Sequence, residues 1–242
     1  VFMAMELIVD KSINRGKSDY GWLKSFHSFS FGNYFNPQKT NFGVLRVLND
    51  DIVSPMKGFG MHPHSNMEII SIVLDGELTH QDNMGNESLI KQGDIQVMSA
   101  GTGVLHSEHN KNKNSNVEFL QIWVIPFKTD VQPRYQQISI QNIKVNNQLF
   151  QILSPNPEDN GVWIYQNAWF YWGEFSIKKS INYKIKSQSN GVYLFVIEGK
   201  VLINNKSIEK RDAIGIRDVR NFNFDVEPNS ILLLMDVPIV NT

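Results

Sequence analysis

The chain has 242 residues, of which 41% are hydrophobic and 19% are charged, with a formal net charge of −1 and no cysteine. This composition is typical of a globular protein with one large core or two smaller ones, and the lack of cysteine excludes disulfides and thiolate metal ligands. A near-neutral chain offers no basic surface for nucleic acid, and no apolar run approaches the roughly 20 residues that span a bilayer. The first ten residues show no cationic start or cleavage signal, so we expect a cytoplasmic protein that contacts neither nucleic acid nor a membrane.

Short apolar or alternating runs, bounded by Gly, Asn, Asp or Pro, follow one another along the chain. They occupy residues 42–48, 68–74, 88–98, 117–125, 191–199 and 230–237. Their richness in Val, Ile, Phe and Tyr is typical of the strands of a sandwich or barrel. No segment combines sustained helical periodicity with caps at both ends. The sequence therefore predicts an all-β protein.

An internal similarity suggests that the strands form two units. Residues 69–78 (IISIVLDGEL) match residues 192–201 (VYLFVIEGKV), since each is an apolar strand that ends in an acid and a glycine before a second strand. Such a repeat favours two barrels of similar plan. The Pro- and Asn-rich stretch 153–161 predicts an exposed loop. Two prolines within 124–133 mark a boundary, so we place the domains at 1–135 and 136–242.

Histidine and glutamate form two alternating triplets, His-Pro-His at 62–64 and His-Ser-Glu at 106–108. Residues two apart in a strand face the same side, so two neighbouring strands inside a barrel would bring four side chains around one point: His62, His64, His106 and Glu108. Imidazole nitrogen and carboxylate oxygen suit a divalent first-row metal. A single triplet would be more typical of unrelated surface or core histidines, whereas two on predicted strands favour a metal site.

Glu68 is an alternative carboxylate because it shares strand parity with His62 and His64. Many metal barrels take a glutamate from this strand, but Gly76 lies one residue too far along for that pattern. We therefore assign Glu108 as the carboxylate ligand. We expect Glu68 to contact the ligands without binding the metal itself, or to have a structural role.

These features resemble the two motifs of the cupin superfamily: H-x-H, then Gly-Asp after two strands, then a glycine turn and H-x-x-x-N. More specific segments resemble the pirin family, namely GFGMHPH (58–64), MEII (67–70), HQDNMGN (80–86), GDIQ (93–96) and MSAGTG (98–103). Residues 21–34 and 45–51 also look like pirin segments. The resemblance is dense over about residues 14–135 and thins afterwards. It is closest to bacterial pirin-like proteins described as quercetin 2,3-dioxygenases.

The resemblance implies a bicupin, with two jelly-roll β-barrels packed face to face and a metal in the first barrel only. It implies the same four ligands and one divalent ion, Fe²⁺ first, with Cu, Mn, Ni or Zn as alternatives. The sequence agrees about the second barrel, because no histidine follows His109, and Ile185 and Ser187 align with His62 and His64.

The activity implied is that of an oxidoreductase that cleaves a flavonol such as quercetin with O₂ and releases CO. Glu108 would be a ligand and could also accept the proton of the substrate hydroxyl. The alternative is a non-catalytic, metal-dependent interaction or regulatory protein with a protein partner, because cupin folds host many such roles. A sugar isomerase shares the ligand set, but the chain lacks the Lys and Arg cluster expected for a sugar phosphate.

Several further side chains carry weaker predictions. Met61, Gln96 and Met98 are expected to line the substrate pocket if they share a face with the ligands. His80 and His109 are expected in turns at the barrel surface.

His27 is expected to be a hydrogen-bonded structural histidine, and the aromatic residues within 163–172 are expected to pack in the core or between barrels. Gly101 and Gly103 are expected to adopt positive φ. Many pirin relatives have Arg-Asp after the H-P-H triplet, whereas this chain has Ser65-Asn66. We expect this departure to remove a charge pair near the pocket mouth, which leaves fine substrate preference open but does not affect metal binding.

Overall fold

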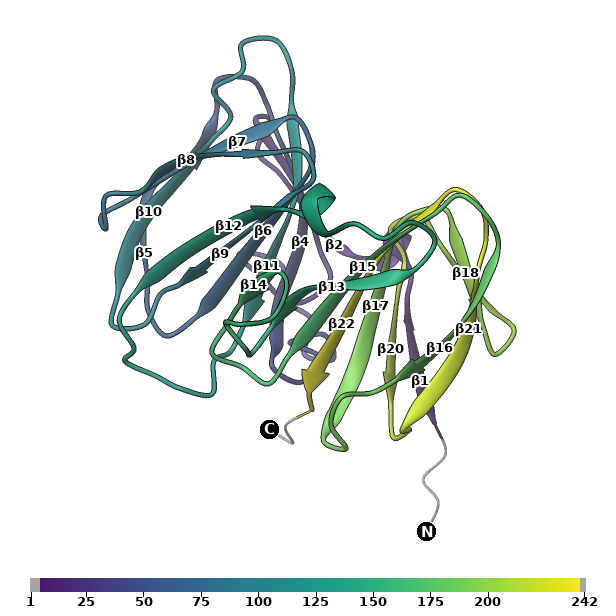
Figure 1. Ribbon diagram of the computed structural model, residues 1–242. Helices are drawn as coiled ribbons and strands as arrows, with labels where there is room; N and C mark the ends of the chain where they lie inside the picture. Colours follow the sequence, from purple (N-terminus) through teal and green to yellow (C-terminus); the bar gives the residue numbers. More distant parts are fainter. Residues whose placement is uncertain (1–4, 240–242) are drawn as a thin grey trace.

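The computed structural model describes residues 5–239, which form two β-barrels lying side by side (Figure 1). Within these residues there are 22 strands, and helix is limited to two short 3-10 turns, η1 (Ser12–Asn14) and η2 (Ile140–Ile143). No helix in this range is long and apolar enough to cross a membrane. The prediction of an all-β fold built from two barrels is confirmed.

The first barrel consists of a seven-stranded and a four-stranded antiparallel sheet. The larger sheet has the order β12 (Arg134–Ser139), β9 (Asp94–Ser99), β6 (Glu68–Asp75), β11 (Val117–Val124), β4 (Leu45–Val53), β3 (Leu23–His27) and β2 (Gly16–Asp19). The smaller sheet has the order β5 (Gly58–His64), β10 (Val104–His109), β7 (Glu77–Asp82) and β8 (Glu87–Lys91). The run predicted over 88–98 is thus two strands, divided at Gly93, where φ is +79°.

The second barrel repeats this arrangement. Its larger sheet has the order β1 (Glu6–Asp10), β20 (Ala213–Arg217), β17 (Asn190–Glu198), β22 (Ser230–Pro238), β15 (Trp169–Phe175), β13 (Leu149–Ser154) and β14 (Val162–Trp163). Its smaller sheet has the order β16 (Lys179–Lys184), β21 (Asn221–Val226), β18 (Lys200–Ile203) and β19 (Lys206–Glu209). The order β9-β6-β11-β4 in the first barrel corresponds to β20-β17-β22-β15 in the second, in agreement with the internal similarity of the sequence.

The predicted division at residue 135 differs from the structure in two places. It falls inside β12, which pairs with β9 as the edge strand of the first barrel. The N-terminal strand β1, in contrast, pairs with β20 at the corresponding edge of the second barrel (Figure 1). The sequence does not show that β1 pairs with β20, because the two strands are about two hundred residues apart.

The two large sheets pack against each other through one shared hydrophobic core. Side chains from β4, β6, β9 and β11 meet side chains from β13, β15, β17 and β22 in this core. Phe170 and Trp172 belong to it, and Trp163 lies under the guanidinium of Arg134 at 3.8 Å. The expectation that the aromatic stretch packs between the barrels therefore agrees with the structure, and the barrels form one rigidly packed unit.

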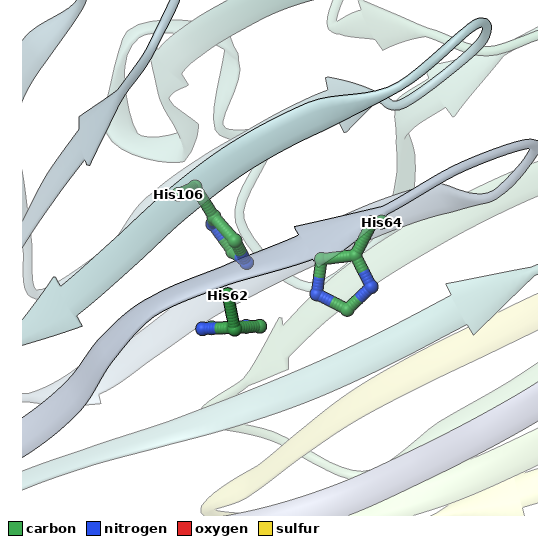
Figure 2. A group of neighbouring side chains, drawn as sticks. All are labelled: His62, His64 and His106. Atoms are coloured by element: carbon green, nitrogen blue, oxygen red, sulfur yellow. The ribbon is translucent and has the colours of Figure 1, made fainter.

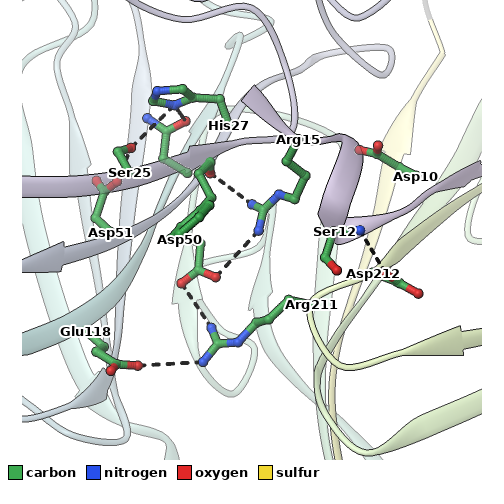
Figure 3. A network of polar contacts seen from close by, with 12 residues as sticks. Asp10, Ser12, Arg15, Ser25, His27, Asp50, Asp51, Glu118, Arg211 and Asp212 are labelled. Carbon is green, nitrogen blue, oxygen red and sulfur yellow. Dashed lines mark hydrogen bonds and ion pairs between the residues drawn. The ribbon is translucent and has the colours of Figure 1, made fainter. Parts of the chain in front are cut away.

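A polar network joins the barrels beside this core (Figure 3). Asp50 on β4 pairs with Arg15 at 3.5 Å and with Arg211 of the second barrel at 3.0 Å. Arg211 also approaches Glu118 on β11 at 3.7 Å. The side chains of Arg15, Asp50 and Arg211 are largely shielded from solvent, and the pair between Asp50 and Arg211 links the two barrels.

The interiors of the two barrels differ in polarity. The second barrel is filled by apolar side chains, among them Ile185, Phe222 and Phe224. In the first barrel the apolar side chains form two smaller clusters, one around Phe119 and one around Met98. The space between these clusters holds polar side chains, so the candidate site lies in the first barrel.

Candidate metal centre

Three histidines converge inside the first barrel. His62 and His64 come from β5 and His106 comes from β10, and Figure 2 shows their rings pointing toward one another. One ring nitrogen of each lies within 4.8 Å of the others. The strand parity predicted from the sequence explains the first pair, and the pairing of His106 directly opposite His62 brings in the third.

Local backbone features orient the three imidazole rings. The register of β10 against β5 shifts between His106 and Glu108, so β5 has one extra residue at this point. Such a bulge redirects the side chains beside it. The turn that leads into β10 contains Gly101 and Gly103 with φ of +45° and +137°, as expected, and a Cβ on Gly101 would lie 2.0 Å from the Val131 carbonyl oxygen.

Hydrogen bonding fixes the tautomer of His62. Its Nδ1 lies 2.7 Å from the carbonyl oxygen of Gly60. A carbonyl can only accept, so Nδ1 carries the proton and Nε2 keeps a free lone pair. Metal-bound histidines are oriented in this way in many proteins. His62 is therefore set up to offer Nε2 to an ion.

Burial keeps the other two imidazoles neutral. Burial, together with the charges of the neighbouring histidines, lowers the pKa of His64 to about 4 and that of His106 to about 2. Both nitrogens of His106 are buried and have no hydrogen-bond partner among residues 5–239. Burying such a group without a partner is costly. A divalent ion held by the three rings would satisfy it, so the residues present fit a metal.

Glu108 faces the same cavity but is held at its wall. Ser71 donates to its Oε1 at 3.0 Å and Gln121 donates to its Oε2 at 2.9 Å. Burial raises the pKa of Glu108 to about 7. Its oxygens do not belong to the group of ligand atoms that lie within 4.8 Å of one another. The structure thus brings three of the four predicted ligands together and places the fourth beside them.

The cavity in front of the histidines has a volume of about 110 Å³. Aromatic side chains form part of its wall, among them Phe31, Phe59 and Trp123. Polar groups complete it, and the lining as a whole comprises Ser18, Tyr20, Leu23, Ser25, His27, Phe31, Gly32, Asn49, Asp51, Phe59, His62, His64, His106, Glu108, Gln121 and Trp123. A mostly apolar cavity with a few convergent polar groups is typical of small-molecule sites.

The three residues predicted for the pocket are not part of this lining. Met61 lies between the two inward positions of β5, so it points outward and is 55% exposed. Gln96 is buried on β9 opposite Ser71, so it faces the same barrel interior, but it is not one of the lining residues. Met98 is enclosed in the small apolar cluster with Ile69. Strand alternation turns Met61 away from the cavity, whereas Gln96 and Met98 are buried inside the barrel without reaching the cavity.

Glu68 lies on the opposite face of β6 from the cavity. It accepts a hydrogen bond from Ser99 Oγ at 2.7 Å, and its charge interacts with Arg134. Burial raises its pKa to about 7. Alternation along β6 turns Ser71 toward Glu108 and Glu68 toward the second barrel. Of the two roles predicted for Glu68, this placement fits the structural one and leaves it no contact with the ligands.

His80 and His109 do not lie in surface turns, so that expectation is wrong. His80 is completely buried on β7, with its ring centre 5.4 Å from that of His106 and its Nε2 2.9 Å from Asp82. His109 is half-buried at the end of β10.

His27 is the hydrogen-bonded histidine that the sequence predicted, since its Nδ1 lies 2.8 Å from Asn49 Oδ1, and it also lines the cavity. The sequence reading missed the lining residues Asp51 and Gln121, although each is a polar residue inside an apolar strand run.

At the mouth, Asn66 has a φ of +48° and exchanges two hydrogen bonds with Asp130. Neither Ser65 nor Asn66 is part of the cavity lining described above. The departure from the Arg-Asp of many relatives therefore changes a turn near the entrance.

The fold and the histidine cluster define this chain as a bicupin with a candidate metal site in its first barrel. Comparison with known proteins is more specific. A family model described as Pirin matches residues 9–124, and one described as a quercetinase C-terminal cupin domain matches residues 151–237. A protein named quercetin 2,3-dioxygenase from Escherichia coli K12 is 37% identical over 94% of this chain and 97% of its own length. The chain belongs to the pirin family.

Solved structures agree with this assignment. The crystal structure of YhhW from Escherichia coli matches with a TM-score of 0.92 and 34% identity, over 98% of this chain and all of that one. A second structure, of the bacterial pirin YhhW in complex with nickel(II), matches with a TM-score of 0.91 over 97% of this chain. A putative quercetin 2,3-dioxygenase from Zymomonas mobilis is 37% identical over 92% of this chain and 94% of its own length. The names of these relatives agree with the expectation of an oxidoreductase.

Proposed function

We propose that this chain is a metal-dependent dioxygenase that cleaves a flavonol such as quercetin with O₂ and releases CO. The observation that carries the proposal is the cluster of three inward-facing histidines at the end of a cavity with aromatic walls. Two kinds of relative support it, those named quercetin 2,3-dioxygenase and the nickel(II) complex of YhhW.

His62, His64 and His106 would hold one divalent ion, with Glu108 as the fourth ligand. We propose Fe²⁺, while Ni, Cu, Mn and Zn suit the same donors. When bound, the ion would act as a Lewis acid toward the 3-hydroxyl and 4-carbonyl oxygens of the flavonol.

The side chains of the cavity supply the remaining functions. Phe31 and Trp123 pack edge to face at 5.4 Å, and Trp123 packs in the same way against His64 at 4.9 Å, which gives the cavity a rigid aromatic wall. Such a wall suits a flat ring system and excludes water from it. Glu108, with a pKa raised to about 7, is suited to accept the proton of the 3-hydroxyl, and Gln121 orients its carboxylate.

The test is to reconstitute the protein with Fe²⁺ under anaerobic conditions, add quercetin, admit air, and measure loss of quercetin together with CO. His62→Ala removes one ligand and should abolish turnover and lower metal content. His109→Ala is the matched control, because His109 lies on β10 outside the cluster of three. Full turnover by His62→Ala would refute the proposal. Bound metal without any turnover in the unaltered protein would favour a binding or regulatory role instead.

A further inference from the structure

One wall of the cavity carries polar side chains that the proposed chemistry does not use. Ser25 and His27 on β3, with Asn49 and Asp51 on β4, line the cavity. Alternation along β4 is responsible, because Asn49 and Asp51 face the cavity while Asp50 faces the ion pairs between the barrels. Figure 3 shows Ser25, His27 and Asp51 gathered on one side of the strand and Asp50 on the other.

Asp51 is a buried carboxylate with spare capacity to accept hydrogen bonds. It is 4% exposed, and burial raises its pKa to about 7. Ser25 donates to its Oδ1. The charge of Arg15 lowers the pKa of Asp51, but the Arg15 guanidinium makes its hydrogen bonds to Asp50 and to the Phe26 carbonyl oxygen. A carboxylate has about four acceptor positions, so one donor leaves most of them free at the cavity wall.

The polar side chains next to Asp51 form hydrogen bonds with one another. His27 Nδ1 donates to Asn49 Oδ1 at 2.8 Å, which leaves Nε2 to accept from Ser18 Oγ at 2.9 Å. Both ring nitrogens of His27 are therefore engaged. The unsatisfied polar capacity of this wall is that of an acceptor, and the complementary group on a ligand is a hydroxyl or another neutral donor.

We propose that Asp51 determines substrate specificity by accepting a hydrogen bond from a ring hydroxyl of the substrate, remote from its chelating oxygens. The inference rests on the proposed function, which places the chelating oxygens at the histidines. The preferred substrate is then a flat aromatic compound with at least one hydroxyl beyond the chelating pair. Phe31 and Phe59 line the same cavity and would pack against its rings.

The test compares two ligands by anaerobic titration of the metal-loaded protein, with quenching of tryptophan fluorescence as the readout. 3-Hydroxyflavone carries the chelating oxygens alone, whereas quercetin has further ring hydroxyls. The unaltered protein should bind quercetin about tenfold more tightly, as expected for a hydrogen bond to a carboxylate. Asp51→Asn should lose this preference through weaker quercetin binding, with the affinity for 3-hydroxyflavone changed by less than about twofold.

Asp50→Asn is the matched control, since it removes an acid from the other face of β4 and should keep the preference even if the protein becomes less stable. Ser25→Ala is a second variant that leaves the carboxylate in place without its donor, and the preference should fall by about threefold. Equal metal content in all variants is checked by elemental analysis.

An absent preference in the unaltered protein, an unchanged preference in Asp51→Asn, or a failure to bind quercetin would each overturn the assignment of Asp51. These titrations need no turnover. A protein that binds quercetin selectively through Asp51 but releases no CO in air would support this inference while contradicting the proposed function.

Discussion

The hydrogen bond from Gln121 to Glu108 offers a quantitative test of the candidate metal centre. Gln121 Nε2 donates to Glu108 Oε2 at 2.9 Å, and Glu108 is 2% exposed. Burial already raises the pKa of Glu108 to about 7, and this hydrogen bond opposes the rise. Gln121→Met keeps the volume of the side chain and removes the donor. The pKa of Glu108 should then rise above 7, so that at neutral pH a proton competes with the metal for the carboxylate.

The expected loss follows from the strength of this bond. A hydrogen bond to a charged group contributes about 1.5–3 kcal/mol, and loss of a group that orients a ligand typically lowers metal affinity by about 10- to 100-fold. We expect Ni²⁺ affinity at pH 7, measured by competition with a chromophoric chelator, to fall within that range. The loss should shrink near pH 9, where Glu108 is ionised in both proteins.

Gln96→Met is the matched control for this experiment. Gln96 lies on β9 opposite Ser71, and its buried Nε2 has no partner among residues 5–239. Its replacement should leave Ni²⁺ affinity unchanged, because it makes no hydrogen bond to Glu108. Unaltered affinity in Gln121→Met, or the same loss in both variants, would refute the role assigned to the Glu108 carboxylate.

Two further predictions concern stability. Burial raises the pKa of Glu68 from 4.5 to about 7, so between these pH values the folded state binds a proton that the unfolded state has lost, and its stability falls as pH rises through 7. The free energy of unfolding of Glu68→Gln should therefore rise, relative to that of the unaltered protein, by up to about 3 kcal/mol between pH 4.5 and pH 8. Urea unfolding of chelator-treated samples measures this difference, and a difference independent of pH would contradict the prediction. Arg211→Ala removes the ion pairs to Asp50 at 3.0 Å and to Glu118 at 3.7 Å and should lower the free energy of unfolding by about 1–3 kcal/mol. The control Lys210→Ala breaks an exposed ion pair and should lower it by less. Equal losses in the two variants would argue against the inter-barrel network.

The convergence of histidines at the candidate metal centre was predictable because it depends largely on local geometry. Alternation in a strand places His62 and His64 on one face whatever the rest of the chain does. The predicted strands at 68–74, 117–125, 191–199 and 230–237 correspond closely to β6, β11, β17 and β22, because each is a buried apolar run ended by a turn residue. The prediction that the second barrel binds no metal depends on the sequence alone, which has no histidine after residue 109.

Other features depend on contacts between distant segments. His80 was expected in a surface turn, yet the pairing of β7 with β10 buries it beside His106. The face of β4 on which Asp51 lies becomes the cavity wall once β3 and β11 pair with β4 on either side. The edge strand β1 belongs to the second barrel for a similar reason.

The all-β class, the two-barrel repeat and the candidate metal-binding histidines could be read from the amino-acid sequence, since they follow from side-chain chemistry and a period of two residues. Contacts between distant strands set which strand faces line the cavity, how Glu108 is held, and what surrounds Glu68. The physical reason is that a strand has two faces, and its sequence shows which residues share a face, whereas the environment of each face is set by strands and sheets far away in the chain.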